Sequence, residues 1–281
     1  MDLIKIGPLT VSRFILGSNP FSGFSHQGSS RDAEMVHYFT TQRIKQVLRD
    51  AESLGITAVI ARADHHVIRT LMEYWDEGGK LQWLAQTCPG VGPTLKTVQM
   101  AIQGGAKAIH IHGGVMDNCL AKGDMSDPLA GIARIREAGL PVGIAGHNPE
   151  VFCWAERQKL DVDYYMCSYY NAAHRDKSAE KSPDQAEWFL EEDRRTIATI
   201  IQGLSRPVIH YKVMAAGRNQ PGEALSFAAT CMRPRDGVCV GVFPKDDSRM
   251  LADDVGIFEQ AWAARGPAQA GTGGGQEEKH L

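Results

Sequence analysis

The sequence lacks the features that mark several classes of protein. Its 281 residues carry a formal net charge of only −3, whereas a nucleic-acid-binding domain usually has a basic patch and an isoelectric point above about 9. No apolar run approaches the roughly 18 residues that a membrane span requires, and residues 1–17 contain no basic leader. We therefore expect a cytoplasmic protein that binds neither nucleic acid nor membranes.

Paired cysteines and a glycine-rich phosphate loop are also missing. The six cysteines include no Cys-x-x-Cys pair, and the chain is long enough to fold without disulfides, so we expect reduced thiols. No Gly-x-Gly-x-x-Gly motif follows the first predicted strand, which disfavours a doubly wound dinucleotide-binding sheet.

Short runs rich in valine, isoleucine and alanine alternate with segments of helical periodicity, and no linker divides them. These runs predict eight strands: Arg13–Ser18, Ala58–Ala63, Gln82–Thr87, Ala108–His112, Val142–Ala145, Asp163–Ser168, Val208–Lys212 and Val238–Phe243. Units of about thirty residues are typical of an α/β barrel. We predict a single (β/α)8 TIM barrel over residues 1–265 and a disordered, glycine-rich tail over residues 266–281.

Histidines gather where the predicted strands end. In a (β/α)8 barrel the C-terminal ends of all strands meet at one mouth, where the chemistry takes place. Six of the ten histidines fall at these ends: His65, His66, His110, His112, His147 and His210. His26 and His174 lie in the irregular segments 19–39 and 172–186, which are candidate lids. The sequence therefore predicts a histidine-rich site at the mouth.

Two of these histidines share one face of a strand. Side chains alternate along a strand, so His110 and His112 point the same way. Imidazole is a common ligand of transition metals, and a catalytic zinc site has about three protein ligands. We predict a divalent metal, Zn²⁺ or Mn²⁺, held by His110, His112, His147 and His26. The alternative is that these imidazoles form hydrogen bonds or transfer protons without a metal.

Other polar residues at the strand ends suit proton transfer and sugar-like ligands. The candidate catalytic residues are His66, Asp64, His112 and Lys212, and Lys212 is also a candidate for a Schiff base with a carbonyl substrate. The candidate substrate-binding residues are Asn19, Arg62, Tyr169, Asn171 and Tyr211. Because His210 and Tyr211 alternate, only one can face inward, and we favour Tyr211.

The first hypothesis follows from these residues. It is a metal-dependent barrel enzyme, a lyase or isomerase, that acts on a small oxygen-rich substrate such as a sugar or keto-sugar. The reaction would be proton abstraction, elimination or isomerisation. The expected partner is a small molecule, and homo-oligomerisation is left open.

Several short segments share the pattern of one known superfamily. On the N-terminal side these are Leu9-Thr10-Val11-Ser12-Arg13 with Leu16-Gly17, Gly55-Ile56-Thr57 with Ala63-Asp64, and Gly143-Ile144 through Pro149-Glu150. On the C-terminal side they are Tyr170-Asn171 with Arg175, Tyr211 with Ala216-Gly217, and Val242-Phe243-Pro244-Lys245. Over nearly its whole length the chain resembles the aldo-keto reductase superfamily, which implies a barrel that reduces carbonyls with a nicotinamide cofactor.

The resemblance also implies site residues, and most of the catalytic ones differ. The family's aspartate falls on Ala61, its tyrosine on His66 and its lysine on the Gln86-Thr87 stretch, whereas His112 matches its histidine. The chain thus resembles a divergent member that lacks most of the catalytic tetrad.

On the cofactor side the match is mixed. Asn171, Tyr211 and Lys245 match cofactor-binding positions, but Asp246 and Asp247 would repel a 2′-phosphate. The second hypothesis is therefore an oxidoreductase using NAD or NADP, with His66 and His112 as proton donors. The third is a ligand-binding barrel without catalysis.

Overall fold

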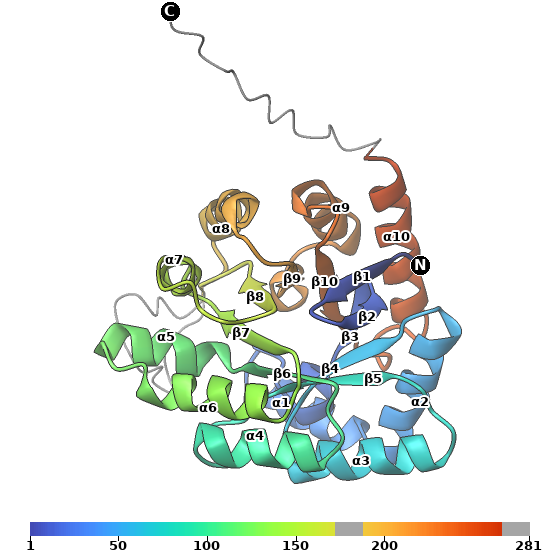
Figure 1. The fold of residues 1–281 in the computed structure, drawn as a ribbon. Coiled ribbons are helices and arrows are strands. Elements are labelled where there is room, and N and C mark those ends of the chain that lie inside the picture. Colours follow the sequence, from blue (N-terminus) through green and yellow to red (C-terminus); the bar gives the residue numbers. More distant parts are fainter. Residues whose placement is uncertain (172–187, 266–281) are drawn as a thin grey trace, which may run out of the picture.

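Eight parallel strands close into a barrel in the structure, a computed structural model that describes residues 1–171 and 188–265 (Figure 1). The strands are β3 (Phe14–Gly17), β4 (Ala58–Arg62), β5 (Gln82–Gln86), β6 (Ala108–Ile111), β7 (Val142–Gly146), β8 (Tyr164–Ser168), β9 (Val208–Tyr211) and β10 (Gly237–Gly241). They follow one another around the ring, and β10 pairs with β3. The predicted fold and all eight strands are confirmed. The predicted lid at 172–186 and tail at 266–281 lie outside the described residues.

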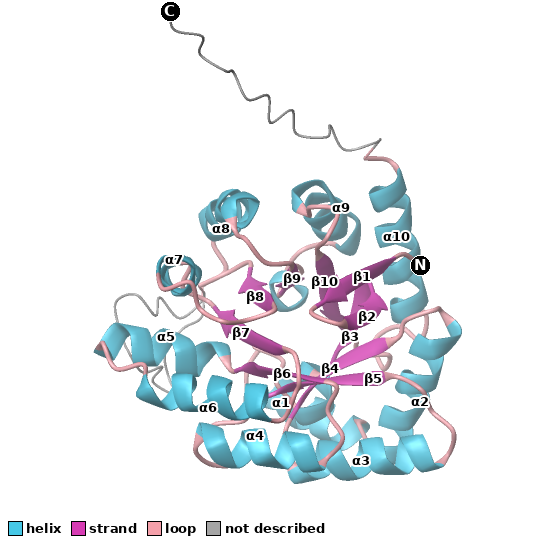
Figure 2. Cartoon of the chain, viewed as in Figure 1, coloured by secondary structure: helices cyan, strands magenta, loops and turns pink. Residues whose placement is uncertain are grey.

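Helices surround the ring of strands (Figure 2). They are α2 (Thr41–Ser53), α3 (His65–Asp76), α4 (Thr94–Gln103), α5 (Gly113–Lys122), α6 (Ser126–Glu137), α7 (Glu150–Arg157), α8 (Glu191–Gly203), α9 (Pro221–Cys231) and α10 (Met250–Ala263). The 3-10 turn η1 (Asn19–Ser22) and α1 (Ser29–Tyr38) lie between β3 and α2, and η2 (Ala215–Gly217) follows β9. Within the described ranges, no helix combines the length and apolar character needed to cross a bilayer.

A hairpin covers the N-terminal end of the barrel. It pairs β1 (Leu3–Ile6) with β2 (Leu9–Ser12), and β3 begins directly after it. Ile4, Ile6 and Val11 of the hairpin are buried in the same cluster as the inward-facing Ile15 and Tyr164. The hairpin therefore fills this end with apolar side chains, and the mouth lies at the opposite end.

The strand register stacks the inward-facing side chains in layers, each built from alternate strands. One layer contains Ile60, His110, Met166 and Cys239. The next layer toward the mouth contains Gly17, Gln86, Ala145 and Tyr211. Glycine and alanine thus occupy two of the four positions directly above His110, which leaves little side-chain volume there.

The prediction that Tyr211 faces inward and His210 outward is confirmed. Tyr211 packs with the apolar cluster inside the barrel. His210 is fully buried on the other face of β9, where its Nδ1 lies 2.9 Å from the Tyr169 hydroxyl and its Nε2 lies 3.5 Å from Asp236 Oδ2. His210 therefore belongs to the layer between the barrel wall and the surrounding helices.

A buried carboxyl group on α10 leads to a prediction about stability. Asp254 is 3% exposed, and burial together with Asp253 and Asp247 raises its pKa to about 7. Because this pKa lies above the unfolded value of about 4, the native state loses stability as the pH rises from 4 to 7. We expect Asp254→Asn to be more stable than the wild type by about 1–3 kcal/mol at pH 8 and nearly equal at pH 4. Thermal unfolding at both pH values measures this, and a difference that does not change with pH would contradict it.

Candidate functional site

A buried carboxylate holds an imidazole at the mouth of the barrel. His147 follows β7 and is 8% exposed, and its Nδ1 lies 2.8 Å from Oδ2 of Asp117, which is 2% exposed. Asp117 Oδ1 also accepts the backbone N–H groups of His147 at 3.0 Å and Asn148 at 3.1 Å. A carboxylate with these donors favours a proton on Nδ1 and places the lone pair of the neutral ring on Nε2.

Helix α5 brings Asp117 to this position. The buried face of α5 consists of Gly113, Met116 and Asp117, which have the i, i+3, i+4 spacing of one helical stripe. This face packs against β7, so the carboxylate reaches the residue that ends this strand. Asp117 is not among the residues predicted from the sequence, although a carboxylate on the buried stripe of a predicted helix is a signal that could have identified it.

Tyr211 and Gly113 complete the surroundings of His147. The rings of His147 and Tyr211 meet edge to face with centroids 5.9 Å apart, and the Tyr211 hydroxyl donates to the Gly146 carbonyl at 3.3 Å. A side chain at Gly113 would place its Cβ 3.0 Å from His147 Cε1 and 3.2 Å from the Tyr211 hydroxyl. A side chain at this position would require these two rings to shift by a few tenths of an ångström, so glycine favours the close approach of α5.

His112 caps the same helix. Its Nδ1 accepts the Gly114 backbone N–H at 3.0 Å, and its own backbone N–H donates to Thr87 Oγ1 at 2.8 Å. Because Nδ1 accepts a hydrogen bond, the proton of the neutral ring is on Nε2. The neutral ring of His112 therefore carries its proton on Nε2, whereas the neutral ring of His147 carries its proton on Nδ1.

The predicted metal site is not assembled in the part of the chain that the structure describes. Across residues 1–171 and 188–265, no group of three or more His, Cys, Asp or Glu side chains is placed to hold a metal ion. Nδ1 of His110 lies near Tyr164, Nδ1 of His112 caps α5, and Nδ1 of His147 meets Asp117. His26 lies on the loop after η1 with a left-handed φ of 56°. The described residues therefore do not bring these four histidines together around one ion, and metal binding stays a prediction.

His66 and Asp64 lie in a different hollow from His147. Both line a groove of about 480 Å³, whose wall contains Phe21, Ser22, Val36, Phe39, Asp64, His65, His66 and Val91. His66 is exposed in the first turn of α3, and Asp64 caps that helix by accepting the Val67 N–H at 2.9 Å. Asp64 is thus committed to the helix end, and His66 does not join the group around Asp117.

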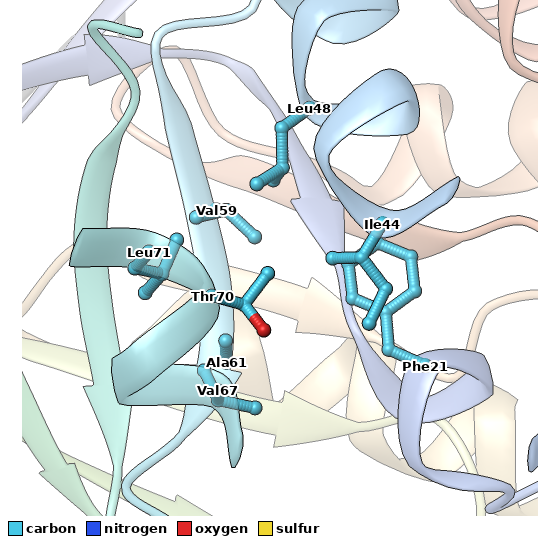
Figure 3. Close-up of a pocket in the computed structure, with 8 residues that line it drawn as sticks. All are labelled: Phe21, Ile44, Leu48, Val59, Ala61, Val67, Thr70 and Leu71. Atoms are coloured by element: carbon cyan, nitrogen blue, oxygen red, sulfur yellow. The ribbon is translucent and has the colours of Figure 1, made fainter. Parts of the chain in front are cut away.

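The resemblance places the superfamily's catalytic aspartate at Ala61. Figure 3 shows that Ala61 does not lie at the mouth of the barrel. Ala61 faces outward from β4 into a small apolar cavity of about 10 Å³ between the barrel wall, α2 and α3. The Thr70 hydroxyl in this cavity donates to the His66 carbonyl at 2.8 Å. This cavity offers room for about one water molecule and no chemistry. The inward-facing neighbours on β4 are Ile60 and Arg62.

The predicted substrate-binding residues separate into two groups. Asn19 begins η1 directly after β3, Asn171 follows β8, and Arg62 stacks on Phe24 with its Cζ 4.4 Å from the ring centroid, so these three lie at the C-terminal strand ends. Tyr169 does not face the mouth, because it is 1% exposed and packs against Phe227 of α9. That part of the prediction is corrected.

Lys212 follows β9 in a left-handed conformation with a φ of 57°. It is half-buried at the start of the segment that leads to η2. Its proposed covalent role with a carbonyl substrate stays a prediction.

Two cations near the β10 rim are paired with carboxylates. Lys245 Nζ lies 2.7 Å from Glu34 Oε1 of α1, and Arg31 of the same helix pairs with Asp246. Hydrogen bonds from Lys245 and Arg31 lower the pKa of Glu34, so its carboxylate stays charged. Lys245 and Arg31 are therefore both paired with carboxylates, and binding of NAD or NADP stays a prediction.

Comparisons with known proteins agree on the fold. No protein-family model and no curated protein sequence matches the chain. Among solved structures, a protein from Pseudomonas aeruginosa described as a "putative aldo-keto reductase" is 16% identical, with a TM-score of 0.61, covering 93% of this chain and 94% of that one.

Two further barrels are similar. A truncated 3-deoxy-D-arabino-heptulosonate 7-phosphate synthase from Thermotoga maritima is 12% identical, with a TM-score of 0.56 and coverage of 94% and 92%. An N-acetylmannosamine-6-phosphate 2-epimerase from Clostridium perfringens is 14% identical, with a TM-score of 0.53 and coverage of 86% and 92%. At these identities the likeness establishes the TIM-barrel fold alone, and the activity must be argued from the site.

Proposed function

We propose that this protein is an enzyme that removes a proton from a carbon next to a carbonyl group in a small hydroxy-carbonyl compound. The Asp117–His147 pair at the barrel mouth carries this proposal. An imidazole oriented by a buried carboxylate is a general base whose protonated form the carboxylate stabilises. The product would be the epimer or the isomer of the substrate.

His147 is the base in this reaction. Its Nε2 lone pair takes the proton from the carbon, and the imidazolium that forms is stabilised by Asp117 at 2.8 Å. The electron pair of the broken C–H bond moves onto the carbonyl oxygen and gives an enediolate. Return of the proton to the same carbon gives exchange or epimerisation. Return to the neighbouring carbon gives isomerisation, provided that the hydroxyl proton of the first carbon moves to the former carbonyl oxygen.

His112 supplies a donor to the developing oxyanion. The cap on α5 keeps the His112 proton on Nε2, and a donor aimed at the oxygen that gains charge lowers the barrier. Neutral imidazole groups and the amides of Asn19 and Asn171 suit hydroxyl groups better than apolar ligands. These residues support a substrate of the sugar or keto-sugar class.

Exchange of carbon-bound hydrogen for deuterium tests the proposal directly. The full chain is incubated in D₂O with dihydroxyacetone, D-glyceraldehyde, D-xylulose and D-fructose, and loss of the C–H signals is followed by proton NMR. We expect exchange above the buffer background for at least one compound, because proton abstraction precedes every outcome of the reaction. Exchange at the buffer rate for all four would overturn the proposal. Repeating the assay after chelator treatment separates metal-dependent from metal-free proton transfer.

A further inference from the structure

His110 is a buried imidazole with one unpartnered nitrogen. It is fully buried inside the barrel, and its Nδ1 lies 3.3 Å from the Tyr164 hydroxyl. Its Nε2 is also buried and has no hydrogen-bond partner among the described residues. A buried polar atom without a partner costs about 1–3 kcal/mol, so its retention calls for an explanation.

The Tyr164 hydroxyl determines which nitrogen of His110 carries the proton. Burial raises the pKa of Tyr164 well above its usual range, so the phenol keeps its hydrogen. Among the described residues the acceptor within reach of this hydrogen is His110 Nδ1. Burial and the nearby His112 lower the pKa of His110 to about 3, so the ring is neutral and its single proton is on Nε2.

A second pair in the same barrel shows what normally completes this arrangement. The Tyr169 hydroxyl lies 2.9 Å from Nδ1 of His210, and the His210 Nε2 faces the Asp236 carboxylate at 3.5 Å. Both histidines are fully buried next to a tyrosine hydroxyl. His210 has a carboxylate for its Nε2–H, whereas the described residues provide no acceptor for that of His110.

We infer that His110 Nε2 is the deepest hydrogen-bond donor of the site and binds an oxygen atom of the hydroxy-carbonyl substrate. The two nitrogens of an imidazole ring point in nearly opposite directions, and Nδ1 of His110 meets Tyr164, whose ring lies toward the hairpin end. Nε2 is therefore directed away from that end. The inference rests on the proposed function for the class of substrate.

The layer above His110 can make room for such an oxygen. Gly17 and Ala145 occupy two of its four positions, and the other two hold Gln86 and Tyr211, which are half-buried. A substrate oxygen that enters between these side chains reaches Nε2 one layer below. Gly143 lets the Tyr164 ring lie against β7, because a Cβ there would be 2.4 Å from Tyr164 Cζ. Gly143 therefore helps to keep Nδ1 partnered and Nε2 available.

Nitrogen NMR of the full chain with ¹⁵N-labelled histidine tests this donor without relying on turnover. We expect the His110 signals, assigned by their loss in His110→Phe, to show a neutral ring protonated at Nε2 from pH 5 to pH 8. Adding the four compounds of the exchange assay, one at a time, should shift the Nε2 signal for at least one of them. An Nε2 signal that no compound moves, or a proton found on Nδ1, would overturn the inference.

A matched pair of variants separates a contact with substrate from a structural role. The glutamine amide in His110→Gln reaches the place of Nε2, whereas the shorter amide in His110→Asn reaches only the place of Nδ1. For the compound that exchanges fastest, we expect kcat/KM to fall about 10-fold or more in His110→Asn and in His110→Phe, and His110→Gln to retain most of it. If kcat/KM fell equally in all three variants, in parallel with a fall in Tm, His110 would have a structural role and the inference would be overturned.

The two proposals fail in different ways. A shifted Nε2 signal without deuterium exchange leaves the donor in place and removes the proposed proton abstraction. Deuterium exchange with an unmoved Nε2 signal and unchanged kinetics in His110→Asn removes the donor alone.

Discussion

Replacing His147 with asparagine is expected to lower the rate of C–H exchange by about 10²- to 10⁴-fold, because the base that takes the proton is lost. Asp117→Asn should also reduce the rate, since an amide that donates to Nδ1 favours the tautomer without a lone pair on Nε2. Proton NMR in D₂O at saturating substrate measures both rates.

The exposed His37 in the last turn of α1 supplies the control for this experiment. His37→Asn removes one imidazole from the same chain and should exchange at the wild-type rate. The melting temperature of each variant shows whether the barrel is intact. A folded His147→Asn protein with an exchange rate within threefold of the wild type, an allowance of about 0.7 kcal/mol in the barrier, would contradict the assignment of the base.

Replacing Asp236 with alanine is expected to lower the free energy of unfolding by about 3–5 kcal/mol. The change removes a buried carboxylate and leaves the donors that face it without an acceptor. Asp236 is fully buried and accepts the Val208 N–H at 2.8 Å, the Arg233 N–H at 2.9 Å and the Arg233 Nε at 2.8 Å. Urea unfolding at pH 7 measures the free energy of unfolding of both proteins.

The pH dependence of this contribution has a definite sign. Burial acts to raise the pKa of Asp236, but hydrogen bonds from His210 and Arg233 outweigh it and lower the pKa to about 2. A folded pKa below the unfolded value of about 4 stabilises the native state above pH 4, and the contribution is lost as the pH falls toward 2. The difference between Asp236→Ala and the wild type should therefore shrink in acid.

An exposed ion pair provides the comparison for Asp236. The Asp161 side chain is 76% exposed and lies 3.0 Å from Arg136 Nη2. Asp161→Ala should cost less than about 1 kcal/mol, as is usual for exposed pairs. If Asp161→Ala and Asp236→Ala lowered the free energy of unfolding by similar amounts, burial would not explain how strongly Asp236 stabilises the native state.

The sequence was sufficient to predict the barrel because its strands are buried on both faces. Val59, Ile60 and Ala61 are all buried although they alternate between the two sides of the wall, and such strands appear as continuous apolar runs. The alternation of His210 and Tyr211 also predicted correctly which one faces inward. Both inferences depend on residues that are close together in the sequence.

The Asp117–His147 pair at the mouth could be predicted only in part, because it depends on a tertiary contact. His147 was predicted as a metal ligand from its place after a strand and not as a base, because its partner Asp117 lies 30 residues earlier on α5. The spacing of His110 and His112 suggested a shared metal. That spacing does not show that α5 begins directly after His112, whose Nδ1 then caps the helix. It also does not show that the Tyr164 hydroxyl lies next to Nδ1 of His110. Hydrogen-bond partners, rather than strand positions, separate the roles of these imidazoles.

The hairpin of β1 and β2 closes one end of the barrel to ligands. Ile4, Ile6 and Val11 fill one end of the barrel, so a ligand that reaches the inner layers has to leave in the direction from which it came. In the proposed reaction, substrate and product share one opening, and each turnover must finish with release before the next molecule enters. Product should accordingly act as a competitive inhibitor, and a compound wedged between Gln86 and Tyr211 would block arrival and departure together.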